Sequence, residues 1–517
     1  MRVHSLDIVS FKNLQNFSIQ FDENSPVSVL VGRNGSGKSN VLEALTLIFR
    51  DLDLGQPPSL SFSIGYECRG HDVRVDAMAG GRYSVYVDTQ RVPANRVIGA
   101  SGDSEKLRPD FVFGYYSGPS NRLEQHFVQH QDRFYRDLVE GVDNPLRPLF
   151  YARTVHSNFV LLAFFLEGDE VVQELLVEHL GIRGLDSVLF EMQAPTWKSP
   201  EGDERFWNAR GTVQRFLDEL YRLALAPMRV NKSYRRGRRT VRQEHLYLFL
   251  AGLDEVRALR RMYRSSQDFF KALESTYISE LIHDVRIRVS LEKAGDVPLT
   301  FRELSEGEQQ LLLVLGLMRF TRGEESLFLL DEPDTHLNPA WSVQYRRFLE
   351  VFGGLSGSSH VLMATHDPLV VSALKREEVR ILERDRDGSI HALQPIEDPQ
   401  GMGVGNLLTS DVYGLRAQLD IATLEKIEEK RHLASRNDLT KQDVERLTFL
   451  AAELRDLGFL IEDRDPDFHE YLRAKYSASA EQHSRPLLRS QEEVEADREL
   501  ADQLYAEMQA ERHGKVD

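Results

Sequence analysis

The sequence predicts an α/β protein with a parallel sheet at its centre, and three observations carry this prediction. A continuous apolar run, PVSVLV at 26–31, precedes a glycine-rich loop, and the helical pattern NVLEALTLIFRDL follows at 40–52. Two later runs, SLFLLDEP and HVLMATHD, are short, apolar and end in acids or histidine. Runs of this kind are typical of strands that are buried on both faces of a parallel sheet.

The remaining elements are assigned in chain order. Residues 3–10 alternate in character and predict a β-strand, and SIQF at 18–21 predicts its neighbour. Short alternating runs at 62–112 are interrupted by glycines, which predicts an antiparallel layer beside the main sheet. Residues 121–300 show helical periodicity without sustained heptads, and the chain beyond 400 is again helical in pattern.

These patterns predict five regions. They are an N-terminal lobe with the glycine-rich loop and the antiparallel β-layer (1–120), a mainly helical insertion (121–300), a C-terminal lobe (301–400), a helical region (401–476) and a polar tail (477–517).

Composition narrows the class of protein. The 517 residues include one cysteine, Cys68, which excludes an internal disulfide and a multi-cysteine zinc site. We find no apolar run long enough to span a membrane and no signal-peptide pattern at the start, so we expect a cytoplasmic protein without a membrane partner.

Net charge argues against a surface covered by nucleic acid, because the chain carries −17 at pH 7. One stretch, MRVNKSYRRGRRTVR at 228–242, is nevertheless basic and contains no acid. A phosphate backbone would be attracted there, and a solvated loop tip is an equally good interpretation. The candidate nucleic-acid contacts in this stretch are Arg235, Arg236, Arg238 and Arg239.

The glycine-rich loop has the sequence GRNGSGKS at 32–39 and fits a triphosphate. Its glycines allow backbone N–H groups to surround the β-phosphate, and the following helix directs its positive end to the same place. Lys38 should reach the β and γ phosphates, and the Ser39 hydroxyl should bind Mg²⁺. The expected nucleotide contacts are Gly32, Asn34, Gly35, Ser36, Gly37, Lys38, Ser39 and Asn40.

A second motif, LFLLDEPDTHLNP at 327–339, places two adjacent carboxylates at the tip of a buried strand. Asp331 would hold Mg²⁺, and Glu332 would act as general base on the attacking water. A solvated strand end is the alternative for this motif alone.

Two further motifs define the class. LSEGEQQLLLVLGLM, from 304, resembles the signature of ABC-type ATPases with Glu306 in place of the first glycine, and Ser305 and Gly307 form an anion site at a helix start. In the families it resembles, this site covers the ATP of another subunit. His366, after HVLMAT, resembles the switch histidine that contacts the γ-phosphate. Taken alone, the signature could be a helix cap and His366 a structural histidine.

Weaker resemblances extend this pattern. Lys12 and Asn13 are similar to the early pair that contacts nucleotide in SMC-like heads, although surface residues of a turn fit equally well. Gln125 is a candidate for the Q-loop glutamine, and Asn338 occupies the D-loop position where aspartate is common.

The chain as a whole resembles the SMC/RecF/OLD branch of ABC-type P-loop ATPases, and within it the PtuA-type ATPases of bacterial anti-phage systems. The matching stretches are FGYYSGPSNRLE, the LSEGEQ-to-LDEPDTHLNP block, GMGVGNLLTSDVYGLRAQLD and DPDFHEYLRA. The resemblance implies an ABC-type (SMC/RecF-like) head with an antiparallel β-layer, a helical insertion and a C-terminal helical region. It also implies ATP and Mg²⁺ as cofactors.

The same resemblance implies partners. The chain would form a homodimer or higher oligomer, and its C-terminal helices would hold an HNH nuclease of the PtuB kind. Septu and retron settings stay open, and so does binding of nucleic acid or of a reverse transcriptase with its DNA. The chain lacks the acidic pattern of a TOPRIM domain and a His-Asn-His set, so we expect it to hydrolyse ATP and to cut nothing.

Three hypotheses follow. The first is a defence ATPase that controls a nuclease partner. The second is a RecF- or SMC-like DNA repair ATPase that clamps DNA through 228–242. The third is a slow ATPase that serves as an oligomerising scaffold.

Overall fold

The computed structural model describes most of the chain as two compact units, Met1–Gln394 and Pro395–Asp517. The described residues are 1–99, 106–142, 147–166, 168–199, 201–236, 239–291, 299–321, 324–355, 358–436 and 438–458, with 491, 495, 496, 499 and 503. The side chains of 234–241 also lie outside the description.

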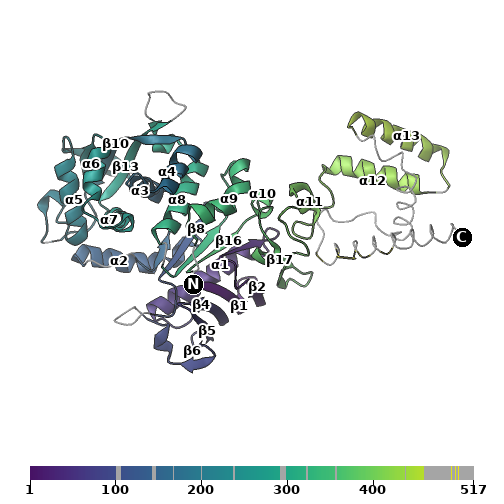
Figure 1. Cartoon of the computed structure of the whole chain (residues 1–517), viewed down its shortest axis with the longest axis horizontal. Helices are drawn as coiled ribbons and strands as arrows, with labels where there is room; N and C mark the ends of the chain where they lie inside the picture. Colours follow the sequence, from purple (N-terminus) through teal and green to yellow (C-terminus); the bar gives the residue numbers. More distant parts are fainter. Residues whose placement is uncertain are drawn as a thin grey trace. The chain divides into compact units, whose positions relative to one another are not determined.

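A seven-stranded sheet forms the centre of the first unit, with the order β18-β17-β3-β16-β15-β8-β9. Its strands β8, β16 and β17 are labelled in Figure 1. All neighbouring strands pair in parallel except β17 and β18. Asp331 pairs with Tyr116 on one side and with Ala364 on the other, so these strands end together. The strands are β3 (Val27–Val31), β8 (Phe111–Tyr116), β9 (Leu149–Tyr151), β15 (Ser326–Asp331), β16 (Ser359–Ala364), β17 (Val379–Arg384) and β18 (Ile390–Leu393).

Helices follow several of these strands, as the apolar runs and helical patterns predicted. Helices α1 (Lys38–Leu54), α9 (Pro339–Val351) and α10 (Pro368–Val371) follow β3, β15 and β16, and α8 (Glu306–Phe320) precedes β15. Asn338 caps α9 by accepting from the Trp341 N–H, and a proline begins the helix, where its missing N–H costs nothing. Because β3 and α1 come from the first lobe and β15 and β16 from a later one, the two expected lobes share one sheet.

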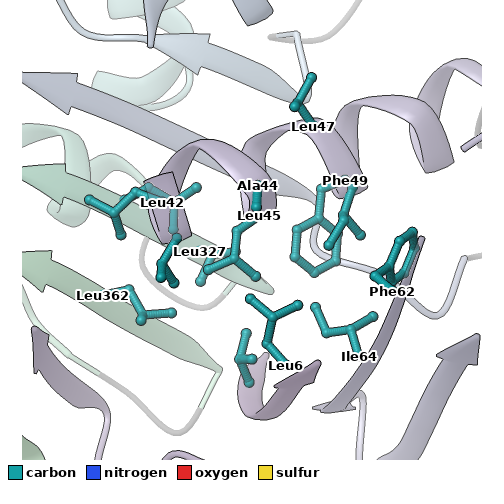
Figure 2. Close-up of a cluster of buried hydrophobic side chains, with 14 of the residues drawn as sticks. Leu6, Leu42, Ala44, Leu45, Leu47, Phe49, Phe62, Ile64, Leu327 and Leu362 are labelled. Atoms are coloured by element: carbon teal, nitrogen blue, oxygen red, sulfur yellow. The ribbon is translucent and has the colours of Figure 1, made fainter. Parts of the chain in front are cut away.

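The predicted antiparallel layer is a six-stranded sheet of order β2-β1-β4-β5-β6-β7. Its inner face packs on α1, and Figure 2 shows Leu6 and Ile64 of this layer beside Leu45 of the helix. Leu327 and Leu362 of the central sheet belong to the same buried cluster, so one core joins both sheets. The strands are β1 (Arg2–Phe11), β2 (Leu14–Gln20), β4 (Phe62–Cys68), β5 (His71–Ala77), β6 (Tyr83–Val87) and β7 (Gln90–Val92).

A buried histidine fastens this layer to the central sheet. His360 of β16 accepts from the Val3 N–H at Nδ1 over 3.1 Å, so its proton lies on Nε2, which is 3.1 Å from Ser28 Oγ. Burial lowers the pKa of His360 to about 3. The imidazole is therefore neutral at physiological pH.

The insertion differs from the expected mainly helical segment, because it contains a five-stranded sheet of order β11-β12-β10-β13-β14. The helical periodicity predicts several helices of this segment but does not predict its long strands. The strands are β10 (Ile182–Gln193), β11 (Met228–Arg236), β12 (Arg239–Leu250), β13 (Ile282–Leu291) and β14 (Leu299–Thr300). The helices are α2 (Val128–Glu140), α3 (Val155–Phe164), α4 (Glu170–Glu174), α5 (Gly211–Leu223), α6 (Leu253–Arg260) and α7 (Ser266–Ile278).

The second unit contains α11 (Val404–Thr409), α12 (Ile421–Ser435) and α13 (Lys441–Asp456). A capping box begins α13, since Thr440 and Asp443 exchange hydrogen bonds. The stretch DPDFHEYLRA, on which part of the resemblance rests, lies outside the described residues, as does nearly all of the tail from 477. No helix in the described part of the chain has the length and hydropathy needed to cross a membrane.

Candidate nucleotide-binding site

The loop between β3 and α1 is folded around the side chain of Lys38. The Lys38 ammonium donates to the carbonyl oxygen of Gly32 at 2.7 Å, so it lies inside the loop. Gly32 has φ of 141° and its missing Cβ would lie 2.3 Å from the Leu382 carbonyl oxygen, which explains the glycine. Burial lowers the pKa of Lys38 to about 8, although Asp331 and Glu332 oppose the shift.

The Ser39 hydroxyl meets the tip of β15. Its Oγ donates to Oδ1 of Asp331 at 3.0 Å, which joins the loop motif to the strand motif across the sheet. Burial raises the pKa of Asp331 to about 6, and the hydrogen bond from Ser39 partly opposes this. A hydroxyl and a carboxylate at this separation are the oxygen ligands that Mg²⁺ uses beside phosphates.

The described residues contain no cluster of three or more His, Cys, Asp or Glu side chains placed to hold a metal. A Mg²⁺ ion at this position would therefore need phosphate oxygens and water to complete its octahedron. Ser36 in the same loop has a buried Oγ without a hydrogen-bond partner in the protein. An orphaned hydroxyl in a phosphate-shaped loop fits a bound phosphate.

Glu332 follows Asp331 and has a strained backbone, with φ of 53°. Its N–H donates to the Ala364 carbonyl oxygen at 2.8 Å, so the residue is fixed between β15 and β16. A carboxylate oxygen of Glu332 lies 3.7 Å from Nε2 of His366. Strain of this kind in a non-glycine residue clusters at functional sites. The structure thus brings the two expected catalytic residues together.

Asp334 was not singled out in the sequence, although it belongs to the same acidic motif. It is buried and accepts a hydrogen bond from the Thr365 hydroxyl. The Thr365 Oγ1 also accepts from the Asp367 N–H at 2.9 Å, so Asp334 supports the turn that carries His366. Burial raises the pKa of Asp334 to about 7, against the opposing hydrogen bond from Thr365. The sequence signal that could identify Asp334 is that it is the third acid in the stretch 331–334, at the end of a buried strand.

The signature motif forms the first turn of α8. Ser305 is the N-cap and exchanges capping hydrogen bonds with Glu308. Gly307 lies against the segment after Glu332, since a Cβ there would be 2.2 Å from the His336 carbonyl oxygen. Ser305 and Glu306 are exposed, and the Glu306 carboxylate lies 3.5 Å from the His336 ring. The start of α8 therefore faces outward.

The early pair lies beside the loop. The Asn13 amide donates to the Gly35 carbonyl oxygen at 2.8 Å and accepts from Asn40 at 2.5 Å, so both expected contacts support the loop. Lys12 forms an ion pair with Glu43 of α1 and has φ of 53°. Its ammonium is engaged within the protein.

The last two candidates are Gln125 and the basic stretch at 228–242. The Gln125 amide donates to the Arg122 carbonyl oxygen at 2.8 Å and lies 3.5 Å from the His126 ring, so its described contacts are with neighbouring residues of its own loop. The basic stretch forms the β11–β12 hairpin, in which Arg229 pairs with Glu244 and Lys232 with Glu191. The side chains of Arg235, Arg236, Arg238 and Arg239 lie outside the described residues, so their role stays a prediction.

Comparison with known proteins agrees with the motifs. A family model described as AAA ATPase domain matches residues 1–78, and one described as AAA domain, putative AbiEii toxin, Type IV TA system matches residues 199–372. The Septu protein PtuA of Bacillus mycoides is 25% identical over 215 residues, which is 39% of this chain and 29% of PtuA. The DNA replication and repair protein RecF of Rickettsia akari is 43% identical over 47 residues, which is 9% of this chain and 12% of RecF.

The matched segments thus span less than a third of the length of these curated relatives. Among solved structures, the SMC head domain from Thermotoga maritima is 14% identical with a TM-score of 0.32, covering 76% of this chain and 99% of that one. The recombination mediator protein RecF is 14% identical with a TM-score of 0.29, covering 76% and 98%. By sequence, the chain is thus similar to AAA-type ATPase domains, to the Septu protein PtuA and, over a short segment, to RecF.

Proposed function

We propose that the chain binds ATP with Mg²⁺ at the loop of 32–39 and hydrolyses it. The 3.0 Å contact between Ser39 Oγ and Asp331 Oδ1 carries this proposal, because it brings together two oxygen ligands suited to Mg²⁺ from motifs that lie far apart in sequence. Bound Mg²⁺ would neutralise charge that develops on the phosphates. Ser39 and Asp331 would hold the ion, and Lys38 would bind the β and γ phosphates.

Glu332 is the proposed general base. It directly follows Asp331 at the end of β15, and its carboxylate would receive a proton from the water that attacks the γ-phosphate. His366, 3.7 Å away, would orient that water or donate to the γ-phosphate. Burial, with help from the nearby Lys38, lowers the pKa of His366, which favours a neutral ring in the nucleotide-free protein.

Two copies are proposed to share each nucleotide. Ser305 is exposed at the outward-facing start of α8, where the helix dipole and the free N–H groups attract an anion. The γ-phosphate held by a second copy fits this place. The oligomer, whether dimer or larger, would close around ATP and open after hydrolysis.

The variant Glu332→Gln tests both proposals, because it keeps the side-chain volume and removes the base. Light scattering with MgATP should then show a stable oligomer, and phosphate release should fall by at least about 10²-fold. Glu377→Gln, at an exposed glutamate of the same unit, is the control and should behave like wild type. An E332Q protein that stays monomeric with ATP would contradict the shared site.

Control of a partner is the finer part of the proposal. Similarity to PtuA supports a role in anti-phage defence, with an HNH nuclease of the PtuB kind as partner and no nuclease activity in this chain. The α12–α13 hairpin supports a docking region, since Val444 and Phe449 are exposed. Phe449→Asp should reduce co-purification with an HNH protein encoded next to this gene, whereas Met78→Ser, at an exposed apolar residue of the other unit, should not.

A RecF-like DNA-binding ATPase is the second candidate. The short RecF similarity and the β11–β12 hairpin favour it. DNA should then stimulate ATP hydrolysis, and replacing Arg235, Arg236, Arg238 and Arg239 by glutamine should remove that stimulation. Equal stimulation in the quadruple variant would leave the hairpin without a role in DNA binding.

A further inference from the structure

The loop between β8 and α2 reaches the phosphate-binding loop through a chain of hydrogen bonds. The Arg122 guanidinium donates to Oδ1 of Asn40 at 2.7 Å. The Asn40 amide donates to Oδ1 of Asn13 at 2.5 Å, and the Asn13 amide donates to the Gly35 carbonyl oxygen at 2.8 Å. Three segments that are distant in sequence, at Arg122, at Asn13 and at 35–40, are thereby connected by hydrogen bonds that all run in one direction.

The direction of this series of hydrogen bonds follows from the chemistry of Arg122, its first donor. A guanidinium has donors only, so the Asn40 side chain must present its oxygen to Arg122. Its NH₂ group then points to Asn13, which must accept with its own oxygen and donate onward with its own NH₂. An amide that rotated by half a turn at either asparagine would place like groups against each other. Arg122 therefore sets the orientation of both amides.

The loop that carries Arg122 is itself anchored to α1. His126 Nε2 lies 2.7 Å from the Glu43 carboxylate, and Arg122 lies 3.6 Å from the same group. Burial of Glu43 would raise its pKa, but hydrogen bonds from His126 and Lys12 outweigh burial and hold the pKa below its usual value. An ionised, buried carboxylate fixes the cations around it.

Two further contacts hold the loop between β8 and α2 in place. The Ser117 hydroxyl lies 3.0 Å from the Thr335 hydroxyl, and Glu124 pairs with Arg153 at 2.6 Å. The loop that carries Arg122 is therefore held to the segment after Glu332 and to the chain at Arg153.

We propose that Arg122 is a positioning residue for the proposed ATPase site, and that it acts through Asn40 and Asn13 on the Gly35 carbonyl of the phosphate-binding loop. This inference rests on the proposed binding of ATP at that loop. Because Gly35 belongs to the part of the loop that surrounds the β-phosphate, Arg122 should affect ADP and ATP equally.

The test measures the affinities of fluorescent methylanthraniloyl-ADP and -ATP with Mg²⁺. Arg122→Ala should weaken both about tenfold, which is the size expected for one charge-assisted hydrogen bond. Asn13→Ala keeps the positive charge and should reproduce the loss for both nucleotides. Arg122→Lys, which retains a donor-only cation, should recover part of the affinity. Arg136→Ala, at an exposed arginine of α2, is the matched control.

Three outcomes would overturn the inference. A loss confined to the triphosphate would make Arg122 a direct γ-phosphate contact instead. Wild-type affinity in Asn13→Ala would reduce the role of Arg122 to its charge, and wild-type affinity in Arg122→Ala would remove the role altogether. Thermal melting of each nucleotide-free variant must match that of Arg136→Ala, which separates positioning from folding. Failure of wild type to bind either nucleotide would instead overturn the proposed function on which the inference rests.

Discussion

The substitution Gly307→Ala tests whether the start of α8 belongs to the catalytic site. The added Cβ would lie 2.2 Å from the His336 carbonyl oxygen, whereas ordinary contacts begin at 3.4 Å. The first turn of α8 must therefore move away from His336 by about 1.2 Å, and Ser305 must move with it. Overpacking of this kind costs about 1–3 kcal/mol of folding free energy.

The displacement has a larger effect on catalysis than on binding. A shift of about 1 Å in a group that contacts the transferring phosphoryl costs about 10²-fold in rate. We expect kcat for phosphate release to fall by about that factor, while the affinity of a monomeric subunit for ATP stays within about twofold of wild type. The atoms nearest to a Cβ at Gly307 belong to His336 and Leu337, not to the binding loop of 32–39.

The assay combines steady-state phosphate release with fluorescence titration of nucleotide. Gly168→Ala is the matched control, because its Cβ would meet nothing within 4 Å and its backbone is not left-handed. Retention of wild-type kcat by a Gly307→Ala protein that folds normally would refute the argument that this turn contacts a nucleotide.

Three further predictions follow from single contacts. Lys38→Ala should weaken ATP binding at least tenfold in a titration, and unchanged affinity would contradict the loop assignment. His360 is neutral in the folded protein and has a pKa of about 6.5 when unfolded, so stability is lost as pH falls below 6.5. In urea denaturation, His360→Gln should abolish about 2.5 kcal/mol of the stability loss between pH 7 and 4.5. For Asp334 the pH dependence of stability has the opposite sign. Its pKa in the folded protein is raised to about 7, so stability falls as pH rises from 4 to 7, and Asp334→Asn should flatten this slope in the same assay.

Local patterns identified the parts of the site that depend on neighbouring residues. The loop of 32–39 and the acids at 331–332 follow strands whose apolar runs are unambiguous, and the structure joins them through Ser39 and Asp331. Sheet order could not be read in this way, because β8 and β15 are neighbours across more than two hundred residues. For the same reason Arg122 and Asn40 could not be paired from the sequence.

In the insertion, prediction of the structure from the sequence fails for a different reason. Its strands β10 and β12 are twelve residues long and mix polar with apolar residues, while helices with strong periodicity lie between them. Helical periodicity is the stronger local pattern in this segment, so the sequence predicts helices there. The five-stranded sheet depends on pairings such as Phe190 with Leu248, which form only in the folded protein. The sequence shows that Asp334 belongs to an acidic motif, but its burial and its hydrogen bond from Thr365 are properties of the tertiary structure.

Subunit mixing tests the shared nucleotide site most directly. Lys38→Ala lacks the phosphate-binding ammonium, and Ser305→Arg blocks the start of α8, so each variant alone should hydrolyse ATP poorly. A mixed dimer contains one intact site, formed by Lys38 from one subunit and Ser305 from the other. The account predicts that mixing the two inactive proteins restores phosphate release to a substantial fraction of wild type. Activity that stays at the level of the separate variants, in a mixture shown to exchange subunits, would contradict it.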